Sequence, residues 1–349
     1  MKIGFDARMI HHSGIGTYSR ELLKLLTQKQ DLDFTLFGDL VKLSNYPAKK
    51  VYAPFPIYSA REQLFFPLLL NKNPVQLLHV PHYNAPLGTS TKLVVTVHDI
   101  IHLKFPPSRL AYIYARGMIE AVCKKAKKII TVSNHAKEDL INVLGIKENK
   151  IKVVYNAVSP VFSESNGSDQ KFKEKYGDYA LYVGNLKSFK NVLRLIQAFV
   201  LAKEKIKEMK LILIGKNFMA QETLVFEKEK DIIFLGEVPF SDLSKFYRNA
   251  KYFVFPSLYE GFGLPPLEAM ASGTPVICSN AASLPEVVGE AALLFDPTQV
   301  QELAKLMVEL WENEGQRKKL IAKGLEQAKK FSWDKAAQEI LKVYEEVAG

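Results

Sequence analysis

The sequence predicts an α/β protein of two doubly wound domains, each built on a parallel sheet. A chain of 349 residues is longer than one hydrophobic core usually serves, and its 48% hydrophobic content is ordinary for a globular protein. Short β-branched runs alternate with longer helical patterns, which is typical of βαβ units and therefore of parallel sheets. One polar stretch, residues 163–178, interrupts the alternation, contains glycines and has no apolar stripe. We interpret it as the linker between the domains.

The expected elements follow in chain order. In the first half the strands are KIGFDARM, DFTLFG, VQLLHV, KLVVTVH, KKIITVS and IKVVYN, with helices such as TYSRELLKLLTQ between them. In the second half they are YALYVG, MKLILIG, DIIFLG, AKYFVFPS and TPVICS. The last segment, SWDKAAQEILKVYEEVA, has apolar residues at helical spacing and predicts a packed amphipathic helix. The expected domains are residues 1–165 and 166–330. A C-terminal helix follows at 331–349, with the first domain as a candidate packing partner.

Composition excludes several classes of protein. The longest apolar run, LFFPLLL, is far shorter than the ~20 residues of a membrane span. Met1 and Lys2 lead directly into strand-like sequence, so we expect no secretory segment. Cys123 and Cys278 have no His or Cys nearby at metal-ligand spacing. We therefore expect no disulfide framework and no zinc site, and a cytoplasmic location fits.

The net charge of +10 is concentrated in the first half of the chain. Residues 1–170 carry 22 Lys and Arg against 13 Asp and Glu, whereas residues 171–349 carry 25 against 24. A basic half attracts nucleic acid, an anionic membrane surface or a phosphate-bearing substrate, and an ordinarily lysine-rich surface is the alternative. No nucleic-acid-binding signature is present. The densest basic segment, which makes the membrane surface a candidate partner, contains Lys124, Lys125, Lys127 and Lys128.

The segment LYEGFGLPPLEAMASGTPVI, residues 258–277, has the composition of a ligand-binding loop that leads into a helix. It follows the expected strand YFVFPS. Pro265 or Pro266 has the fixed φ suited to a first helical turn, and Gly273 is suited to ending a short helix. Gly261 and Gly263 let the backbone approach a ligand closely. The helix start then offers N–H groups and a positive dipole end to an anion such as a diphosphate.

Glu260 and Glu268 in this segment need a separate explanation, because a carboxylate aimed at an anion would repel it. We expect them to accept hydrogen bonds from hydroxyl groups that flank a diphosphate. A nucleotide sugar has such hydroxyls on both sides. The alternatives are a solvated loop acid for Glu260 and, for Glu268, a first-turn acid that complements the helix dipole.

The pattern of a glutamate, seven residues and a second glutamate resembles the signature of glycosyltransferase family 4, retaining nucleotide-sugar enzymes with the GT-B fold. The resemblance is co-linear over nearly the whole chain. It is carried further by GIGTYSRELL, VHDIIHLKFP, ITVSNHAKEDL, VVYNAVSPVF, YVGNLKSFKN, LPEVVGEAALLFDP and the tryptophan-containing terminal helix. Within the family, the sequence is most similar in character to bacterial mannosyltransferases that elongate O-antigen or other surface polysaccharides.

The resemblance implies two Rossmann-like domains that face a cleft, with the acceptor bound by the first and the nucleotide-sugar donor by the second. It assigns the ribose hydroxyls to Glu268 and the transferred sugar and phosphate to Glu260. The donor would be held by the backbone amides of Phe262, Gly263 and Leu264.

The segment VGNLKSFKN, with Gly184 and Asn185, resembles the family's phosphate-binding loop. Lys190 matches its lysine, whereas Asn185 and Phe189 occupy places where relatives often have an arginine. A lysine there has a physical purpose, because a leaving diphosphate gains charge as the glycosidic bond breaks and a cation stabilises it. Lys187 is a candidate second cation, with a solvated loop lysine as the alternative.

Three residues of the first domain are further candidates. The resemblance places the loop of Gly14 and Gly16 under the diphosphate and the acceptor, and turn formation is the alternative explanation for these glycines. His98 ends the apolar strand KLVVTV, where ligand-facing residues are expected. The resemblance places it against the donor sugar, and a hydrogen-bonded structural histidine is the alternative.

The implied reaction is transfer of an α-linked sugar to an acceptor hydroxyl with retention. Glu260 and Glu268 already have donor-binding tasks and no third carboxylate is a candidate nucleophile, so we expect a front-face displacement in which the departing phosphate takes the acceptor's proton. We expect no cofactor and no metal. The donor that the resemblance favours is GDP-mannose. Its mannose would be transferred to a glycan or a lipid-diphosphate-linked acceptor at the inner face of the plasma membrane. The alternatives are a nucleotide-sugar epimerase and a non-catalytic sugar-nucleotide binding protein.

Overall fold

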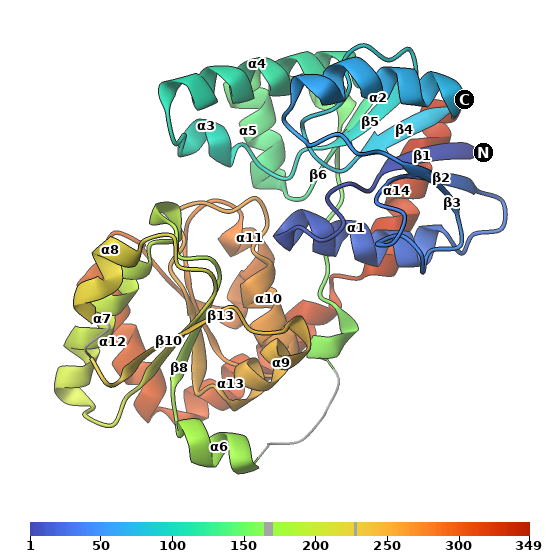
Figure 1. The fold of residues 1–349 in the computed structure, drawn as a ribbon. Coiled ribbons are helices and arrows are strands. Elements are labelled where there is room, and N and C mark those ends of the chain that lie inside the picture. Colours follow the sequence, from blue (N-terminus) through green and yellow to red (C-terminus); the bar gives the residue numbers. More distant parts are fainter. Residues whose placement is uncertain (164–169, 227–228) are drawn as a thin grey trace. The chain divides into compact units, whose positions relative to one another are not determined.

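The computed structural model describes residues 1–163, 170–226 and 229–349, which form two compact units (Figure 1). The first unit consists of Met1–Asn156 and Ser332–Gly349, and the second of Ala157–Phe331. Every strand pair of the described residues is parallel, so the predicted α/β class is confirmed. The tasks expected of the two domains stay predictions.

The first unit is built on a seven-stranded sheet in the order β3-β2-β1-β4-β5-β6-β7. Its strands are β1 (Lys2–Asp6), β2 (Asp33–Gly38), β3 (Lys49–Tyr52), β4 (Leu77–Val80), β5 (Lys92–Thr96), β6 (Lys128–Thr131) and β7 (Ile151–Val153). Its helices are α1 (Ser13–Leu26), α2 (Ala60–Lys72), α3 (Ile101–Lys104), α4 (Arg109–Lys125), α5 (Asn134–Leu144) and α14 (Trp333–Ala348). Figure 1 shows α1 and α14 on one face and α2 and α4 on the other, as right-handed crossovers require when the strand order reverses at β1.

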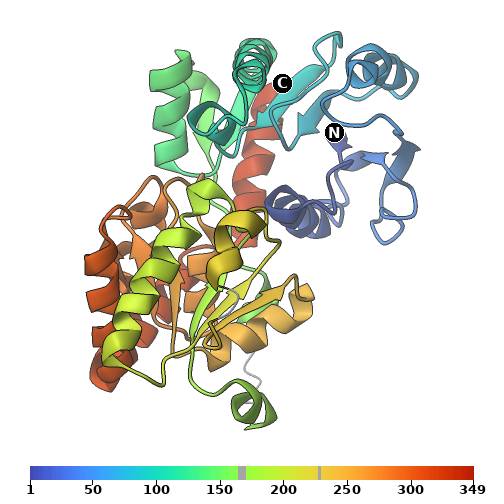
Figure 2. The same cartoon turned by 60° about the vertical axis from the view of Figure 1, so that its left-hand side comes forward.

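The second unit has a six-stranded sheet in the order β10-β9-β8-β11-β12-β13. Its strands are β8 (Ala180–Val183), β9 (Leu211–Ile214), β10 (Ile232–Gly236), β11 (Tyr252–Phe255), β12 (Val276–Ser279) and β13 (Ala292–Phe295). Its helices are α6 (Gln170–Tyr176), α7 (Val192–Lys205), α8 (Ala220–Thr223), α9 (Phe240–Asn249), α10 (Leu264–Ala271), α11 (Leu284–Val288), α12 (Val300–Glu312) and α13 (Glu314–Lys329). α7 and α12 lie side by side on one face (Figure 2), and α10 packs against α13 on the other.

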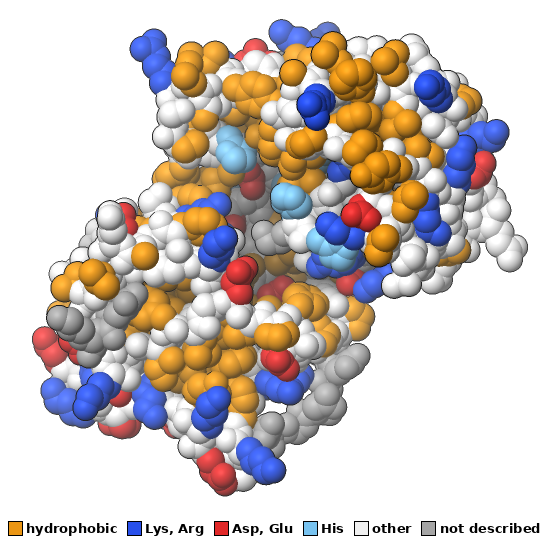
Figure 3. Space-filling model, viewed as in Figure 1, with side chains coloured by type: hydrophobic (Ala, Val, Ile, Leu, Met, Phe, Trp, Pro, Cys, Tyr) orange, Lys and Arg blue, Asp and Glu red, His pale blue; other side chains and the backbone are white. Residues whose placement is uncertain are grey.

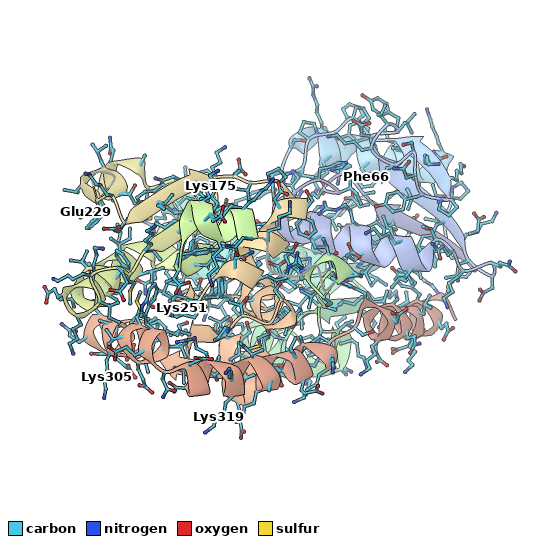
Figure 4. The ribbon with its side chains drawn as sticks, turned by 90° about the horizontal axis from the view of Figure 1, so that it is seen from below. Phe66, Lys175, Glu229, Lys251, Lys305 and Lys319 are labelled. Atoms are coloured by element: carbon cyan, nitrogen blue, oxygen red, sulfur yellow. The ribbon has the colours of Figure 1, made fainter. Side chains whose placement is uncertain are left out.

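Helices cover both faces of each sheet, which explains why the central strands read as continuous apolar runs. All residues of β4, β8, β9 and β11 are buried. The covering helices are amphipathic and direct their charged side chains outward, as Figure 4 shows for Lys305 of α12 and Lys319 of α13. No helix of the described residues has the length and apolar content to cross a bilayer.

The structure differs from the sequence-based expectation at three elements. The four-residue edge strands β3 and β13 were not expected, and both are largely exposed or half-buried. Part of the predicted linker is instead a helix, α6. Its Phe172 and Tyr176 pack against Phe246 with ring centroids 4.8 and 5.6 Å apart. The linker interpretation is therefore wrong for residues 170–176, while residues 164–169 lie outside the described part of the chain.

The C-terminal helix α14 belongs to the first unit, and a buried chain of hydrogen bonds ties it to the sheet. The Tyr344 hydroxyl lies 2.6 Å from Nδ1 of His79 in β4, and Nε2 of His79 lies 2.7 Å from Oγ1 of Thr96 in β5. The Thr96 hydroxyl is in turn 2.9 Å from the Tyr18 hydroxyl of α1. Burial lowers the pKa of His79 to about 3, so its ring stays neutral and both nitrogens need a partner.

We predict that Tyr344→Phe destabilises the first unit by about 1–3 kcal/mol, because His79 then loses a buried partner. The chain offers a unit-specific probe, since Trp333 lies in the first unit and Trp311 in the second. In a Trp311→Phe background, urea unfolding followed by Trp333 fluorescence reports the first unit alone. Tyr52→Phe is the matched control, because Tyr52 is 59% exposed. Equal midpoints for the two variants would contradict the prediction.

Candidate functional site

The loops that follow β8 and β9 pass so close to each other and to their neighbours that each requires a glycine. Gly184 has φ +152° and a Cβ there would lie 2.9 Å from the Tyr182 hydroxyl. Gly215, which follows β9, has φ +138°, and its Cβ would lie 2.1 Å from the Gly184 carbonyl oxygen. After Gly184 and Asn185 the chain forms a short 3₁₀ turn that ends at Lys190. The predicted phosphate loop is therefore a tight turn at the carboxyl end of the sheet.

The loop that follows β11 carries Glu260 and leads into α10. Ser283 holds it in place, because its hydroxyl lies 2.9 Å from the carbonyl oxygens of both Glu260 and Phe262. Gly263 has φ +100° and precedes the first helical residue, Leu264. Prolines occupy the first turn of α10 as predicted. The backbone at the start of this helix is thus fixed before any ligand arrives.

The two loops meet through an ion pair. The Leu258 N–H donates to the Phe189 carbonyl at 2.8 Å. Lys190 Nζ lies 2.5 Å from Glu260 Oε1, and the two side chains are 17% and 13% exposed. The ammonium group also lies 5.3 Å from the ring centroid of Phe255. A cation and a carboxylate therefore sit together, close to solvent, at the carboxyl edge of the sheet.

Glu268 occupies a different environment. It is the fifth residue of α10, beyond the first turn, so the alternative of a first-turn acid that complements the dipole is wrong. The residue is 9% exposed, and its Oε2 accepts a 2.9 Å hydrogen bond from the Tyr247 hydroxyl of α9. Burial raises the pKa of Glu268 to about 7, although the bond from Tyr247 acts in the opposite direction. This carboxyl group is therefore partly protonated near neutral pH.

The candidates of the first unit lie around α1. Gly14 has φ 13° inside the helix, and a Cβ there would meet no atom within 4 Å. A Cβ on Gly16 would lie 2.8 Å from the Ile10 carbonyl oxygen, so close packing accounts for Gly16. His98 Nε2 lies 3.1 Å from the Pro81 carbonyl, and its ring meets Tyr18 edge-on at 4.8 Å. Burial lowers the pKa of His98 to about 4, so the ring is neutral.

The structure brings the predicted residues together in two groups. In the second unit these are Gly184, Asn185, Lys190, Glu260, Phe262, Gly263, Leu264 and Glu268, which occupy two contacting loops and the helix that follows. In the first unit they are Gly14, Gly16 and His98. Sequence reasoning missed Tyr247 and Ser283, which lie far from their partners along the chain. It also missed Asn191, whose buried side-chain amide donates to the carbonyl oxygens of Pro256 and Pro297 at 3.0 and 2.7 Å.

The described residues contain one trio that could in principle ligate a metal, formed by Asp6, Glu62 and His82. Arg8 already occupies this cluster. Its Nη2 lies 2.6 Å from Asp6 Oδ2 and 2.5 Å from Glu62 Oε1. The guanidinium supplies the positive charge that a metal would bring, so the donor set does not fit a metal site.

Comparison with known proteins gives the class that this fold and site define. Residues 12–162 match the model of Glycosyltransferase Family 4, and residues 165–327 match that of Glycosyl transferases group 1. The O-antigen chain mannosyltransferase B of Escherichia coli is 31% identical over 99% of both chains. The O-antigen chain mannosyltransferase RfbU of Salmonella typhimurium is 34% identical over 64% of this chain and 61% of its own. The protein belongs to glycosyltransferase family 4, a family of retaining hexosyltransferases with the GT-B fold.

Solved structures agree on the fold. The Anabaena protein HepE, crystallised with UDP-glucose, aligns with a TM-score of 0.80 at 19% identity over 99% of this chain and 100% of its own. Sucrose-phosphate synthase from Thermosynechococcus elongatus aligns with a TM-score of 0.81 at 20% identity, over 99% of each chain. At such identities the likeness bears on the architecture, and it confirms the GT-B fold.

The raised pKa of Glu268 predicts a pH-dependent gain in stability for Glu268→Gln. The pKa of this carboxyl group is higher in the folded state than its value of 4.5 in the unfolded state. Its ionisation therefore lowers the free energy of unfolding. The penalty is absent below pH 4.5 and complete above about pH 7. We expect the variant to exceed the wild type by about 2–3 kcal/mol at pH 8 and to match it at pH 4.

This prediction is checked by urea unfolding followed by Trp311 fluorescence in a Trp333→Phe background, which reports the second unit. Glu290→Gln is the control, because the Glu290 side chain is 93% exposed. A gain that is the same at both pH values would show that Glu268 is not the group that titrates.

Proposed function

We propose that the protein transfers a sugar from a nucleotide diphosphate donor to an acceptor hydroxyl with retention of configuration. The observation that carries this proposal is the pair of Lys190 and Glu260 beside the start of α10. Open α/β sheets bind ligands beyond the carboxyl ends of their strands, and this pair lies there with limited exposure. A diphosphate can replace Glu260 as the partner of Lys190, which leaves the glutamate for the sugar hydroxyls.

The donor diphosphate would be held from two directions. Lys190 and the loop of Gly184 and Asn185 approach it from β8. The backbone of Phe262, Gly263 and Leu264 would approach it from β11 at the start of α10, where Pro265 and Pro266 contribute no N–H of their own. These groups neutralise the charge that develops on the leaving phosphate. We therefore propose that the reaction needs no divalent metal.

Glu268 would bind the ribose of the donor. A carboxyl group with a pKa of about 7 both donates and accepts hydrogen bonds near neutral pH, so it can match either hydroxyl orientation. The Tyr247 hydroxyl fixes one of its oxygens. Burial makes this arrangement selective, because a ligand without a hydroxyl at that place would leave a buried polar group without its partner.

His98 would contact the donor sugar as a neutral hydrogen-bond acceptor. Its Nε2 faces the Pro81 carbonyl, which requires a proton on Nε2 and leaves Nδ1 as an acceptor. In the front-face displacement proposed for this chemistry, the glycosidic bond breaks first and the departing phosphate oxygen takes the proton of the attacking hydroxyl. None of these protein groups then acts as a nucleophile.

We further propose mannose from GDP-mannose as the donor and a glycan or lipid-diphosphate-linked acceptor of surface polysaccharide synthesis. The similarity to two O-antigen mannosyltransferases supports this choice. The test is a panel of GDP-mannose, UDP-glucose, UDP-galactose and UDP-N-acetylglucosamine, incubated with mannose-containing acceptors in the presence of EDTA. An epimerase would convert the donor without acceptor, and a binding protein would give neither transfer nor hydrolysis. Activity that returns only with manganese or magnesium would refute metal independence.

The same assay tests the ion pair. We expect Lys190→Ala to reduce turnover by about 100-fold or more, as is typical for loss of one charge-stabilising group. Glu268→Ala should reduce it by a similar factor, because the ribose hydroxyls then lose their buried partner. Lys305→Ala is the control, because Lys305 is an exposed lysine of α12 in the same unit. Lys190→Ala leaves Glu260 to repel the diphosphate, so the double variant Lys190→Ala/Glu260→Gln should recover donor affinity but not turnover. Wild-type turnover in Lys190→Ala would remove the proposed role.

We also propose that the first unit binds an anionic membrane surface. The four-lysine cluster expected from the sequence needs one correction, which concerns Lys128. Lys128 is paired with Glu346 at 2.7 Å and is only 21% exposed. Lys124, Lys125 and Lys127 are exposed. Apolar side chains gather over α2 (Figure 3), which lies on the same face of the sheet as α4. Exposed lysines together with exposed apolar side chains are suited to peripheral binding at an anionic membrane surface.

We predict that Lys124→Gln/Lys125→Gln/Lys127→Gln weakens sedimentation with anionic vesicles at low salt, since each lysine contributes about 1 kcal/mol near such a surface and salt screens it. The control changes three exposed lysines of the second unit, Lys207, Lys305 and Lys319, to Gln. Both variants lose the same charge. Equal pelleting of the two would exclude this surface as the site of contact.

A further inference from the structure

Three aromatic side chains form a cluster at the carboxyl edge of the first sheet. The rings of Tyr58 and Tyr83 have centroids 5.7 Å apart, and those of Tyr83 and His102 are also 5.7 Å apart. They come from three different connections, which follow β3, β4 and β5. Tyr58 is 41% exposed, His102 is exposed and Tyr83 is half-buried. Ring surface thus remains open to solvent at the edge where such sheets bind ligands.

Tyr58 holds a strained backbone conformation. Its φ is +60°, which lies in the left-handed region that bulky side chains avoid. Such strain persists only where the surroundings enforce it, and it concentrates at binding sites. Here the Tyr58 N–H donates to Glu62 Oε2 at 3.0 Å. Glu62 is fully buried and is held through its other oxygen by Arg8, which is bound in turn to Asp6.

The same buried carboxylate positions the other side of the cluster. Glu62 Oε2 also accepts a hydrogen bond from the side-chain amide of Asn84, the residue after Tyr83. Asn84 Oδ1 accepts a 2.8 Å hydrogen bond from the Tyr114 hydroxyl of α4. Tyr114 is itself 43% exposed. Phe66, labelled in Figure 4, packs under the guanidinium of Arg8 at 4.5 Å. One buried ionic network therefore holds the backbone of Tyr58, the side chain of Asn84 next to Tyr83 and, through Asn84, the hydroxyl of Tyr114.

We propose that Tyr58, Tyr83 and His102 form a subsite for a neutral pyranose of the acceptor glycan. A pyranose has a face of C–H groups within a rim of hydroxyls. Aromatic rings carry negative charge on their faces, which attracts C–H groups, and tyrosine adds a hydroxyl that bonds to the rim. The inference deepens the proposed transferase function, on which it rests, by naming what the first unit recognises.

The charges near the cluster favour a neutral sugar over a phosphate group. Burial is the main cause that raises the pKa values of Tyr58 and Tyr83, and the carboxylate of Asp99 raises both further. Glu62 acts on Tyr58 in the same direction. These carboxylates disfavour an anion such as a diphosphate beside the rings and leave uncharged hydroxyls unaffected.

Tyr58→Gly is the informative variant. It removes the ring, while glycine adopts φ +60° without strain, so the fold is retained. We expect the KM for a mannose-terminated acceptor to rise about fivefold or more, in line with loss of one aromatic contact. The KM for the donor and the rate of donor hydrolysis should not change. Tyr52→Ala, at another exposed tyrosine of the same unit, is the control.

Saturation-transfer NMR tests the subsite without turnover, so it separates failure of this inference from failure of the proposed function. Aromatic protons of the wild type should saturate C–H protons on one face of at least one disaccharide of mannose, glucose, galactose or N-acetylglucosamine. Tyr58→Gly should lose this transfer, and Tyr52→Ala should keep it. The inference is overturned by no transfer to any disaccharide, by equal transfer in Tyr58→Gly, or by transfer to GDP that Tyr58→Gly abolishes.

Discussion

Parallel strand pairing is the constraint on which the rest of this structure depends. Because every strand in a sheet points the same way, all connections that follow a strand emerge at one edge. Residues that are far apart along the chain are brought together there, as Lys190 and Glu260 are in the second unit and Tyr58, Tyr83 and His102 are in the first. The connections at the opposite edge contain none of the residues assigned to the donor or the acceptor sugar, although the basic residues Lys124, Lys125 and Lys127 lie there. Topology thus explains why the residues proposed for the donor and the acceptor sugar all lie at one edge of each sheet.

Each unit holds a cation against a carboxylate at that edge, but the two arrangements differ in burial. Arg8 is 5% exposed and its partners Asp6 and Glu62 are fully buried, so opening this cluster would leave charges uncompensated in the interior. Lys190 and Glu260 keep more contact with solvent, so an anion can compete for the lysine at lower cost. The cluster around Arg8 is suited to fixing the loops of the first unit in place. The pair of Lys190 and Glu260 is suited to a lysine that exchanges its carboxylate partner for a bound anion.

The sequence was sufficient for the elements that a local pattern specifies. Central strands are buried on both faces and therefore apolar throughout, which made them recognisable. Glycines and prolines marked the start and end of α10 correctly. Edge strands such as β3 were not predicted, because one edge and part of one face of such a strand contact solvent. Fewer of its residues are therefore apolar. The helix α6 was not predicted, because its aromatic residues pack against Phe246, which is distant along the chain.

Side-chain pairing could not be predicted in the same way. Nothing local connects Glu268 to Tyr247 or Glu62 to Asn84, since these contacts are made by packing between helices and loops. The burial of Glu268, and hence its raised pKa, follows from that packing as well. Spacing and resemblance identified which residue types to examine, whereas the protonation state and the strained backbone of Tyr58 became visible only in three dimensions.

The position of α14 has a consequence for biosynthesis. The second unit is inserted between β7 and α14, so its polypeptide is complete at Phe331, before the last helix of the first unit is made. α14 buries Trp333, Ile340 and Tyr344 against the first unit, whose sheet has one face incompletely covered until this helix arrives. During translation the second unit is therefore synthesised completely before the first unit is. The unit encoded first must wait with exposed apolar surface, which is the period in which a chaperone would protect it.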